Sequence, residues 1–227
     1  MRVRNYRSRA FRRTAGWVVF VALFASVPPA QAAEPGTSKD ARDLLATYMR
    51  SAERDSPRWS SLMADGKARS DFCAHCHGVD GISVMPLVPN LAGQNPYYLL
   101  EQLRKFADGR REDYIMSPQA REMTSDDRAV LVFYYTNMTP RAETADPDLA
   151  RHGGGLFRMR CVACHGTDAH GGEKFARLAG QNPAYLTRRL TGFQEATGRS
   201  ISPMTAIAKT LTDNDIEALT AYLSTLP

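Results

Sequence analysis

One motif constrains this chain more than any other feature: cysteine, two further residues, cysteine and histidine, present twice. The two copies comprise Cys73, Cys76 and His77, and Cys161, Cys164 and His165. This spacing is the attachment signature of c-type haem, in which two thiols bond one porphyrin and the following histidine supplies an axial nitrogen to the iron. The chain has four cysteines in all, so two haems would use every one of them.

Two other chemistries fit a single copy of the motif. One is a thioredoxin-like redox pair, and the other is half of a zinc site built from four thiolates. A zinc ribbon would hold its two cysteine pairs within about twenty residues, whereas Cys76 and Cys161 are 85 residues apart. Each copy is also followed by glycine, Gly78 or Gly166, and begins a similar stretch of sequence. The duplication therefore predicts two covalently bound haem c groups.

Residues 1–32 have the pattern of a secretory signal peptide. Six arginines precede an apolar segment over 15–27 that is too short to span a membrane comfortably, and residues 30–32 form a small-residue cleavage site. An uncleaved membrane anchor is the alternative. Cleavage would leave 23 basic and 24 acidic residues and change the formal charge from +5 to −1. The sequence thus predicts a periplasmic protein with no nucleic-acid partner, and peripheral association with a membrane stays open.

The rest of the chain divides into an extension and two repeats. Residues 33–58 are polar, with Leu44, Leu45, Tyr48 and Met49 at helical spacing, and predict a short surface helix that leans on the first repeat. Residues 59–140, the first half, and 141–227, the second half, repeat each other. The loop Leu-Ala-Gly-Gln-Asn-Pro occurs in both, at 91–96 and 178–183. Each copy predicts an asparagine N-cap with proline at the first helical position.

The helical pattern predicts an all-α fold. Amphipathic segments follow the repeated loops, over 97–106 and 184–193, and capping boxes with Asp in place of Glu open final helices at Thr124 and Thr212. No useful strand-like alternation occurs, and residues 139–148 indicate an interdomain linker. We therefore predict two tandem modules, each built around one covalent haem that forms much of its core.

Two methionines are candidates for the second iron ligand. A thioether is a soft ligand that favours Fe(II) and raises the reduction potential. Met116 and Met204 each follow the motif histidine by 39 residues, in a stretch close to proline that we expect to be irregular. Met85 is the rival, although it has no partner in the second half. We assign Met123, Met138 and Met159 to packing, and we expect His75, His152 and His170 to be exposed polar residues.

Taken together, the Cys-x-x-Cys-His-Gly motifs, the repeated loop, the Tyr-Leu-x-x-x-Leu helix, the Gly-Arg pair before a methionine and the duplication resemble the di-haem cytochrome c4 family over 59–227. The resemblance implies two class I cytochrome c folds related by a pseudo-twofold axis, with haem propionates near their interface. In such domains a proline carbonyl accepts the N–H of the ligand imidazole. Pro89 fits that role, whereas the second half has Ala176 and Arg177 there. The first half also lacks an aromatic residue where the second has Phe157.

The function implied is electron transfer without catalysis. Our leading hypothesis is a periplasmic carrier of single electrons between respiratory components, toward a terminal oxidase. The alternative is the electron-accepting subunit of a periplasmic dehydrogenase. A di-haem peroxidase is a third class, and it would need an iron that loses its sixth ligand. Arg110, Arg111 and Arg199, which precede the candidate methionines, are hypothesised to pair with propionates.

Overall fold

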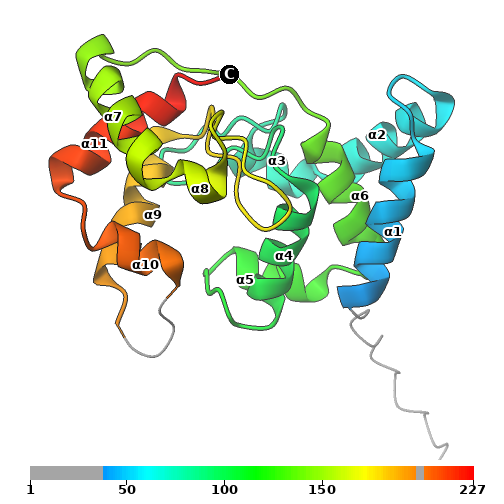
Figure 1. Ribbon diagram of the computed structural model, residues 1–227. Coiled ribbons are helices and arrows are strands. Elements are labelled where there is room, and N and C mark those ends of the chain that lie inside the picture. The colour runs from blue at the N-terminus through cyan, green and yellow to red at the C-terminus, as the bar shows by residue number, and fades with distance from the viewer. Residues whose placement is uncertain (1–37, 198–201) are drawn as a thin grey trace, which may run out of the picture. The chain divides into compact units, whose positions relative to one another are not determined.

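The computed structural model of the chain describes residues 38–197 and 202–227. The predicted signal peptide (1–32) and Arg199 lie outside the described residues. Every regular element within them is a helix, as predicted (Figure 1). In chain order the helices are α1 (Ser38–Ser51), α2 (Pro57–Arg69), α3 (Asp71–His77), α4 (Pro96–Ala107), α5 (Met116–Glu122), α6 (Ser125–Thr136), α7 (Pro147–Arg160), α8 (Val162–His165), α9 (Pro183–Glu195), α10 (Pro203–Ala208) and α11 (Asp213–Ser224).

The order of the helices follows the duplication. Helices α2 to α6 correspond one by one to α7 to α11, and the predicted amphipathic segments are α4 and α9. Both of these helices begin at the proline of the repeated loop, where a fixed φ and a missing N–H suit the first helical position. Among the described helices, α1 alone has no counterpart in the second half.

The final helix of each half begins at the predicted capping box. The Thr124 hydroxyl accepts from the Asp127 N–H at 3.1 Å, and the Asp127 carboxylate accepts from the Thr124 N–H at 3.0 Å. Thr212 and Asp215 exchange the same two bonds at 3.2 and 2.9 Å. An aspartate therefore satisfies two N–H groups at the start of the helix in the way that glutamate does in the usual box.

Glycines allow the first helix of each half to cross the last helix closely. A Cβ added at Gly66 of α2 would lie 2.4 Å from the Cβ of Tyr134 in α6. In the second half, a Cβ at Gly153 of α7 would lie 1.9 Å from the carbonyl oxygen of Ala218 in α11. Real side-chain atoms do not approach so closely, so both crossings require a residue without a Cβ.

The aromatic residue that the first half lacks is replaced by ion pairs. Phe157 is fully buried, with its ring centroid 5.7 Å from that of Tyr222. In the first half the position equivalent to Phe157, four residues before the first cysteine, is Arg69. Its guanidinium pairs at 2.8 Å with Asp65, Asp126 and Asp127. An apolar contact between the first and last helices thus becomes a charged contact at the edge of the same crossing.

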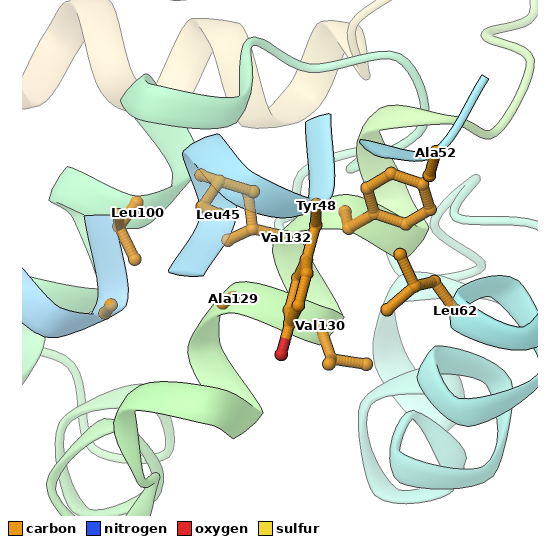
Figure 2. Close-up of a cluster of buried hydrophobic side chains, with 10 residues drawn as sticks. Leu45, Tyr48, Ala52, Leu62, Leu100, Ala129, Val130 and Val132 are labelled. Carbon is orange, nitrogen blue, oxygen red and sulfur yellow. The ribbon is translucent and has the colours of Figure 1, made fainter. Parts of the chain in front are cut away.

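The N-terminal extension forms the helix that we expected to lean on the first half, and the inner face of this helix belongs to the core of that half. Leu45 and Tyr48 of α1 are 0% and 8% exposed and pack among buried residues of α2, α4 and α6 (Figure 2). Met49, on the outer face, is exposed. The physical reason lies in α6, where all eight residues from 128 to 135 are buried. A helix whose residues are buried on every side needs cover all round, and α1 supplies part of that cover.

The two halves exchange equivalent hydrogen bonds through their repeated loops. Gln94 donates to the Arg177 carbonyl at 2.9 Å and accepts from its N–H at 2.7 Å. Gln181 makes the same two bonds, at 2.9 and 2.7 Å, with the backbone of Asn90. Both glutamines and both backbone partners are 87 residues apart in sequence. Such an exchange is what a twofold relation between repeats produces, so the pseudo-twofold arrangement is confirmed.

The asparagines of these loops also bridge the halves. Asn182 accepts from the Tyr185 N–H at 3.2 Å, as an N-cap should, and its Nδ2 donates to carbonyls of the first half. Asn95 makes no capping bond, although it occupies the N-cap position. Its Nδ2 instead donates at 2.9 Å to the carbonyls of His170 and Phe175. The loops therefore both start a helix and join the repeats.

Candidate haem sites

Both cysteine pairs lie on a short helical segment that ends at a glycine. Cys73 and Cys76 belong to α3, while Cys161 precedes α8 and Cys164 lies within it. All four are free thiols. Gly78 and Gly166 end these helices with φ of +80° and +78°, a region that favours glycine. A Cβ at Gly78 would lie 1.9 Å from the carbonyl oxygen of Ile82, so the turn after His77 also has no room for a side chain at this position.

The two motif histidines are buried and oriented alike. His77 and His165 are 7% and 8% exposed. The Nδ1 of His77 lies 2.9 Å from the Pro89 carbonyl oxygen, and the Nδ1 of His165 lies 2.9 Å from that of Ala176. A carbonyl only accepts, so Nδ1 carries the proton and Nε2 keeps a free lone pair. Burial lowers the pKa of both imidazoles, which favours the neutral form that a metal requires.

The second half therefore has the backbone acceptor that its sequence left open. Pro89 plays the part that the family resemblance implies, and Ala176 replaces it without loss of the bond. Every residue type has a carbonyl oxygen, so the side chain at this position does not decide whether the histidine is oriented.

Met116 and Met204 lie in short helices, not in the irregular stretches that we expected. Met116 is the first residue of α5, where its N–H donates to Asp113 at 3.0 Å. Met204 follows Pro203 at the start of α10, which is capped by the Ser202 hydroxyl. Proline in the first turn of a helix blocks no intrahelical bond, so the prolines that suggested irregular chain are compatible with these turns. Both methionines are partly buried.

The exposed fractions of the other methionine and histidine side chains can be compared with the roles expected for them. Met123 and Met138 pack against the cluster around Tyr135, as predicted. Met159 is 74% exposed, so its assignment to packing is wrong: Phe157, two positions earlier in α7, points to the opposite side of the helix and takes the core place. The rival ligand Met85 is 45% exposed. The three remaining histidines are exposed, as expected, namely His75, His152 and His170.

Sequence reasoning missed one buried polar residue beside the first site. Tyr135 of α6 is 4% exposed and packs against Cys73. Burial raises the pKa of both the Tyr135 phenol and the Cys73 thiol. The equivalent residue in the second half is Leu223, 88 positions later, which packs near Cys161. A direct comparison of the two repeats would have found this difference.

Arg111 joins the two halves near the candidate methionines. It donates to Gln102 at 2.8 Å and, across the interface, to the Tyr185 hydroxyl at 3.0 Å. The neighbouring Tyr98 has its pKa raised to about 12, chiefly by burial. Arg110 pairs instead with carboxylates of its own half, Asp108 at 2.7 Å and Glu101 at 3.2 Å. Of the three arginines proposed to pair with propionates, Arg111 reaches the interface and Arg110 does not, while Arg199 lies outside the described residues.

The residues present fit covalent haem in both halves. Each half supplies two free thiols on one short helical segment, and an imidazole whose outer nitrogen is held by a carbonyl. Burial raises the pKa of Cys161 to about 11, so this thiol is neutral at physiological pH and suits an apolar pocket. No group of three or more acidic, histidine and cysteine residues placed to hold a metal ion occurs within the described residues.

Comparison with known proteins agrees with this assignment. Residues 63–139 match the family model for cytochrome c, and residues 148–223 match that for cytochrome c oxidase, cbb3-type, subunit III. Cytochrome c4 of Pseudomonas aeruginosa is 33% identical over 176 residues, covering 72% of this chain and 88% of the relative. A thiosulfate dehydrogenase electron acceptor of Thiomonas intermedia is 31% identical over 170 residues, covering 68% and 78%. The crystal structure of reduced cytochrome c4 from Pseudomonas stutzeri superposes with a TM-score of 0.66 at 32% identity, covering 72% of this chain and 98% of that one.

Two repeated all-helical halves, each with a covalent attachment motif and an oriented imidazole, define a di-haem c-type cytochrome. When bound, the haem irons supply one-electron redox chemistry. Within this class, the sequence identity to known relatives and the share of their length that the chain covers assign the protein to one family. The chain belongs to the cytochrome c4 family.

Proposed function

We propose that this protein carries single electrons in the periplasm between respiratory components, toward a terminal oxidase. Two haem irons that are each closed by a histidine and a methionine would have no position for a substrate, which suits a carrier. The observation that carries the proposal is the matched pair of buried histidines, each held through Nδ1 by a carbonyl and each followed 39 residues later by a methionine at the start of a short helix.

In this proposal His77 with Met116, and His165 with Met204, would hold the two haem irons, and the four motif cysteines would attach the porphyrins. The surroundings of the two histidines position these ligands and do not react themselves. The carbonyls keep each imidazole in one tautomer, and burial favours its neutral form. The proposed domain limits are 59–140 and 141–227. The location rests on the leader pattern of residues 1–32, and within 38–197 and 202–227 no helix is long and apolar enough to cross a membrane.

A Met204→Ala variant of the haem-loaded protein tests the ligand assignment. We expect it to bind carbon monoxide at one iron and to lose about half of the far-red sulfur-to-iron absorption band, because one of two thioether ligands is removed. Met159→Ala is the matched control, since Met159 belongs to the same half and is 74% exposed. For the first half, Met116→Ala is paired with Met85→Ala. An unaltered spectrum for Met204→Ala, or wild-type protein that binds carbon monoxide readily, would refute the carrier mechanism.

The similarity to thiosulfate dehydrogenase electron acceptors favours a second candidate, an acceptor for a periplasmic dehydrogenase. Two assays separate the candidates. Membranes that contain a cytochrome-oxidising terminal oxidase should reoxidise the reduced protein in the presence of oxygen, and cyanide should stop the reaction. A thiosulfate dehydrogenase with thiosulfate should reduce the oxidised protein only if the second candidate is right. Fast electron transfer in the second assay, with none in the first, would show that the acceptor role replaces the one we propose.

A further inference from the structure

A cavity of about 280 Å³ lies away from the haem motifs, between α1, α4 and α6. Ala41 and Arg42 of α1 line one side, and Tyr97 and Arg104 of α4 line another. The third side is Arg128 of α6. Three arginines thus surround one space, although none of them lies near the cysteine pairs in sequence.

Arg128 is the unusual member of this group. It is 5% exposed, and one of its donors, Nη2, reaches the Ala120 carbonyl oxygen at 2.9 Å. Its Nε is buried without a hydrogen-bond partner, and no carboxylate among the described residues lies within 4.0 Å of its guanidinium. Burial is the one cause that lowers its pKa. A buried charge without a counter-charge is costly, because the lost hydration is not replaced.

The carboxylates near the cavity already have partners. Glu101 also lines the cavity, but it accepts from Arg104 at 2.7 Å and from Arg110 at 3.2 Å, and Lys105 lies 4.0 Å away. Arg42 pairs with Glu173 of the second half, and its guanidinium stacks 4.3 Å above the ring of Tyr97. The acidic groups therefore offset the outer arginines and leave the charge of Arg128 unbalanced.

The second half shows that the fold does not need arginine at this place. Arg128 follows its capping threonine by four residues, and the residue four after Thr212 is Ile216, which is 3% exposed in the core. Among the helices of the second half that the structure describes, none is equivalent to α1. The buried arginine and the helix that closes the cavity over it occur together in the first half.

We propose that this cavity binds a small inorganic oxyanion of the sulfate or phosphate class, with Arg128 at its buried end and Arg42 and Arg104 at its exposed side. Guanidinium N–H groups form a planar fork that matches the oxygens of such anions and gives no comparable fit to a halide. The cavity, at about 280 Å³, is large enough for one tetrahedral oxyanion and several waters.

Binding would connect three helices of the first half. The anion would be held by α1, α4 and α6 together, and the protein would gain stability in proportion to the occupancy of the site. This role is separate from electron transfer, because no residue of the cavity belongs to the proposed attachment or ligand set. Failure of one proposal leaves the other intact.

Thermal unfolding of the haem-loaded protein tests the site. Sodium sulfate and sodium phosphate should each raise the unfolding temperature along a saturable curve, and sodium chloride at equal ionic strength should not. In a sample labelled with nitrogen-15, the Nε–H resonance of Arg128 should shift along the same curve. Arg128→Ile, which copies Ile216, should abolish the saturable phase, and Arg42→Gln should weaken the apparent affinity about tenfold through loss of one charged contact.

Two variants serve as controls. Arg50→Gln makes the same change on the exposed side of α1, outside the cavity, and should leave the affinity for sulfate unchanged. Glu173→Gln breaks the ion pair of Arg42 but keeps its charge, so it should bind sulfate at least as well as wild type. If Arg128→Ile does not fold, Arg42→Gln and the Arg128 resonance decide the matter. A sulfate effect that rises without saturation, or one that is equal in wild type and Arg42→Gln, overturns the proposal.

Discussion

At the scale of single residues, close helix contacts and buried polar groups distinguish positions that look alike in sequence. Three glycines stand in a row in α7, at 153, 154 and 155. A Cβ at Gly153 would lie 1.9 Å from the backbone of α11, whereas a Cβ at Gly155 would meet nothing within 4 Å. The same residue type thus serves tight packing at one position and has no packing role two positions later.

Alanine substitutions at these two glycines should have opposite effects. Gly153→Ala forces α7 away from α11 and should destabilise the protein by about 1–3 kcal/mol. Gly155→Ala adds a side chain in open space and removes backbone freedom in a helix, so it should stabilise the protein by up to about 1 kcal/mol. Denaturant unfolding of the haem-loaded protein measures both. The packing argument fails if the two variants are equally stable.

At the scale of helices, the capping boxes connect the start of each final helix to pH. The N–H of Thr212 donates to Asp215 and lowers the pKa of that carboxyl. A carboxyl with a lowered folded-state pKa adds stability above its unfolded pKa of about 3.9, and this stability is lost as the pH falls through the folded value. The cap of α11 should therefore weaken in acid and not in base.

Asp215→Asn should flatten the acid side of the stability profile. The amide can still accept a hydrogen bond but does not titrate, so the variant should lose less of its stability than wild type between about pH 5 and pH 2.5. Unfolding temperatures across this range provide the measurement. Asp213→Asn is the control, because Asp213 is the first residue of the same helix and lies outside the capping box. Parallel acid profiles for wild type and Asp215→Asn would count against the cap as the source of the pH dependence.

At the scale of the whole molecule, the loops that join the halves decide how the two haem sites are placed. Gln94 and Gln181 are 5% and 6% exposed, and each makes two bonds to the backbone of the opposite half. Removal of either side chain would leave an N–H and a carbonyl of the opposite half without partners, buried at Asn90 and partly buried at Arg177, which costs up to about 1–3 kcal/mol for each group.

The double variant Gln94→Ala with Gln181→Ala should therefore uncouple the halves. We expect unfolding to change from one transition to two, and electron exchange between the haems to slow as their spacing loosens. Calorimetry and the line widths of haem resonances report the two effects. Gln119→Ala in α5 is a matched control, since no side-chain hydrogen bond from Gln119 crosses between the halves in the described residues. A single sharp transition in the double variant would show that other contacts carry the coupling.

Much of this protein is determined locally by its sequence. The cysteine and histidine spacing, the proline and asparagine at the loop ends and the threonine with aspartate three residues later act over one helical turn, so the attachment motifs and the starts of α4, α6, α9 and α11 were predictable. The duplication identified the candidate methionines, because their equal spacing from the two motif histidines can be found without knowledge of the fold.

Tertiary structure decided what depends on neighbours far apart in sequence. The inner face of α1 is buried because it covers α6, and Met159 is exposed because Phe157 takes the core position. Asn95 bonds across the halves because the second half approaches it. The unpaired charge of Arg128 appears only when α1, α4 and α6 meet. Patterns in a sequence report periodicity and local bonding, whereas burial and unpaired groups are properties of the assembled surfaces.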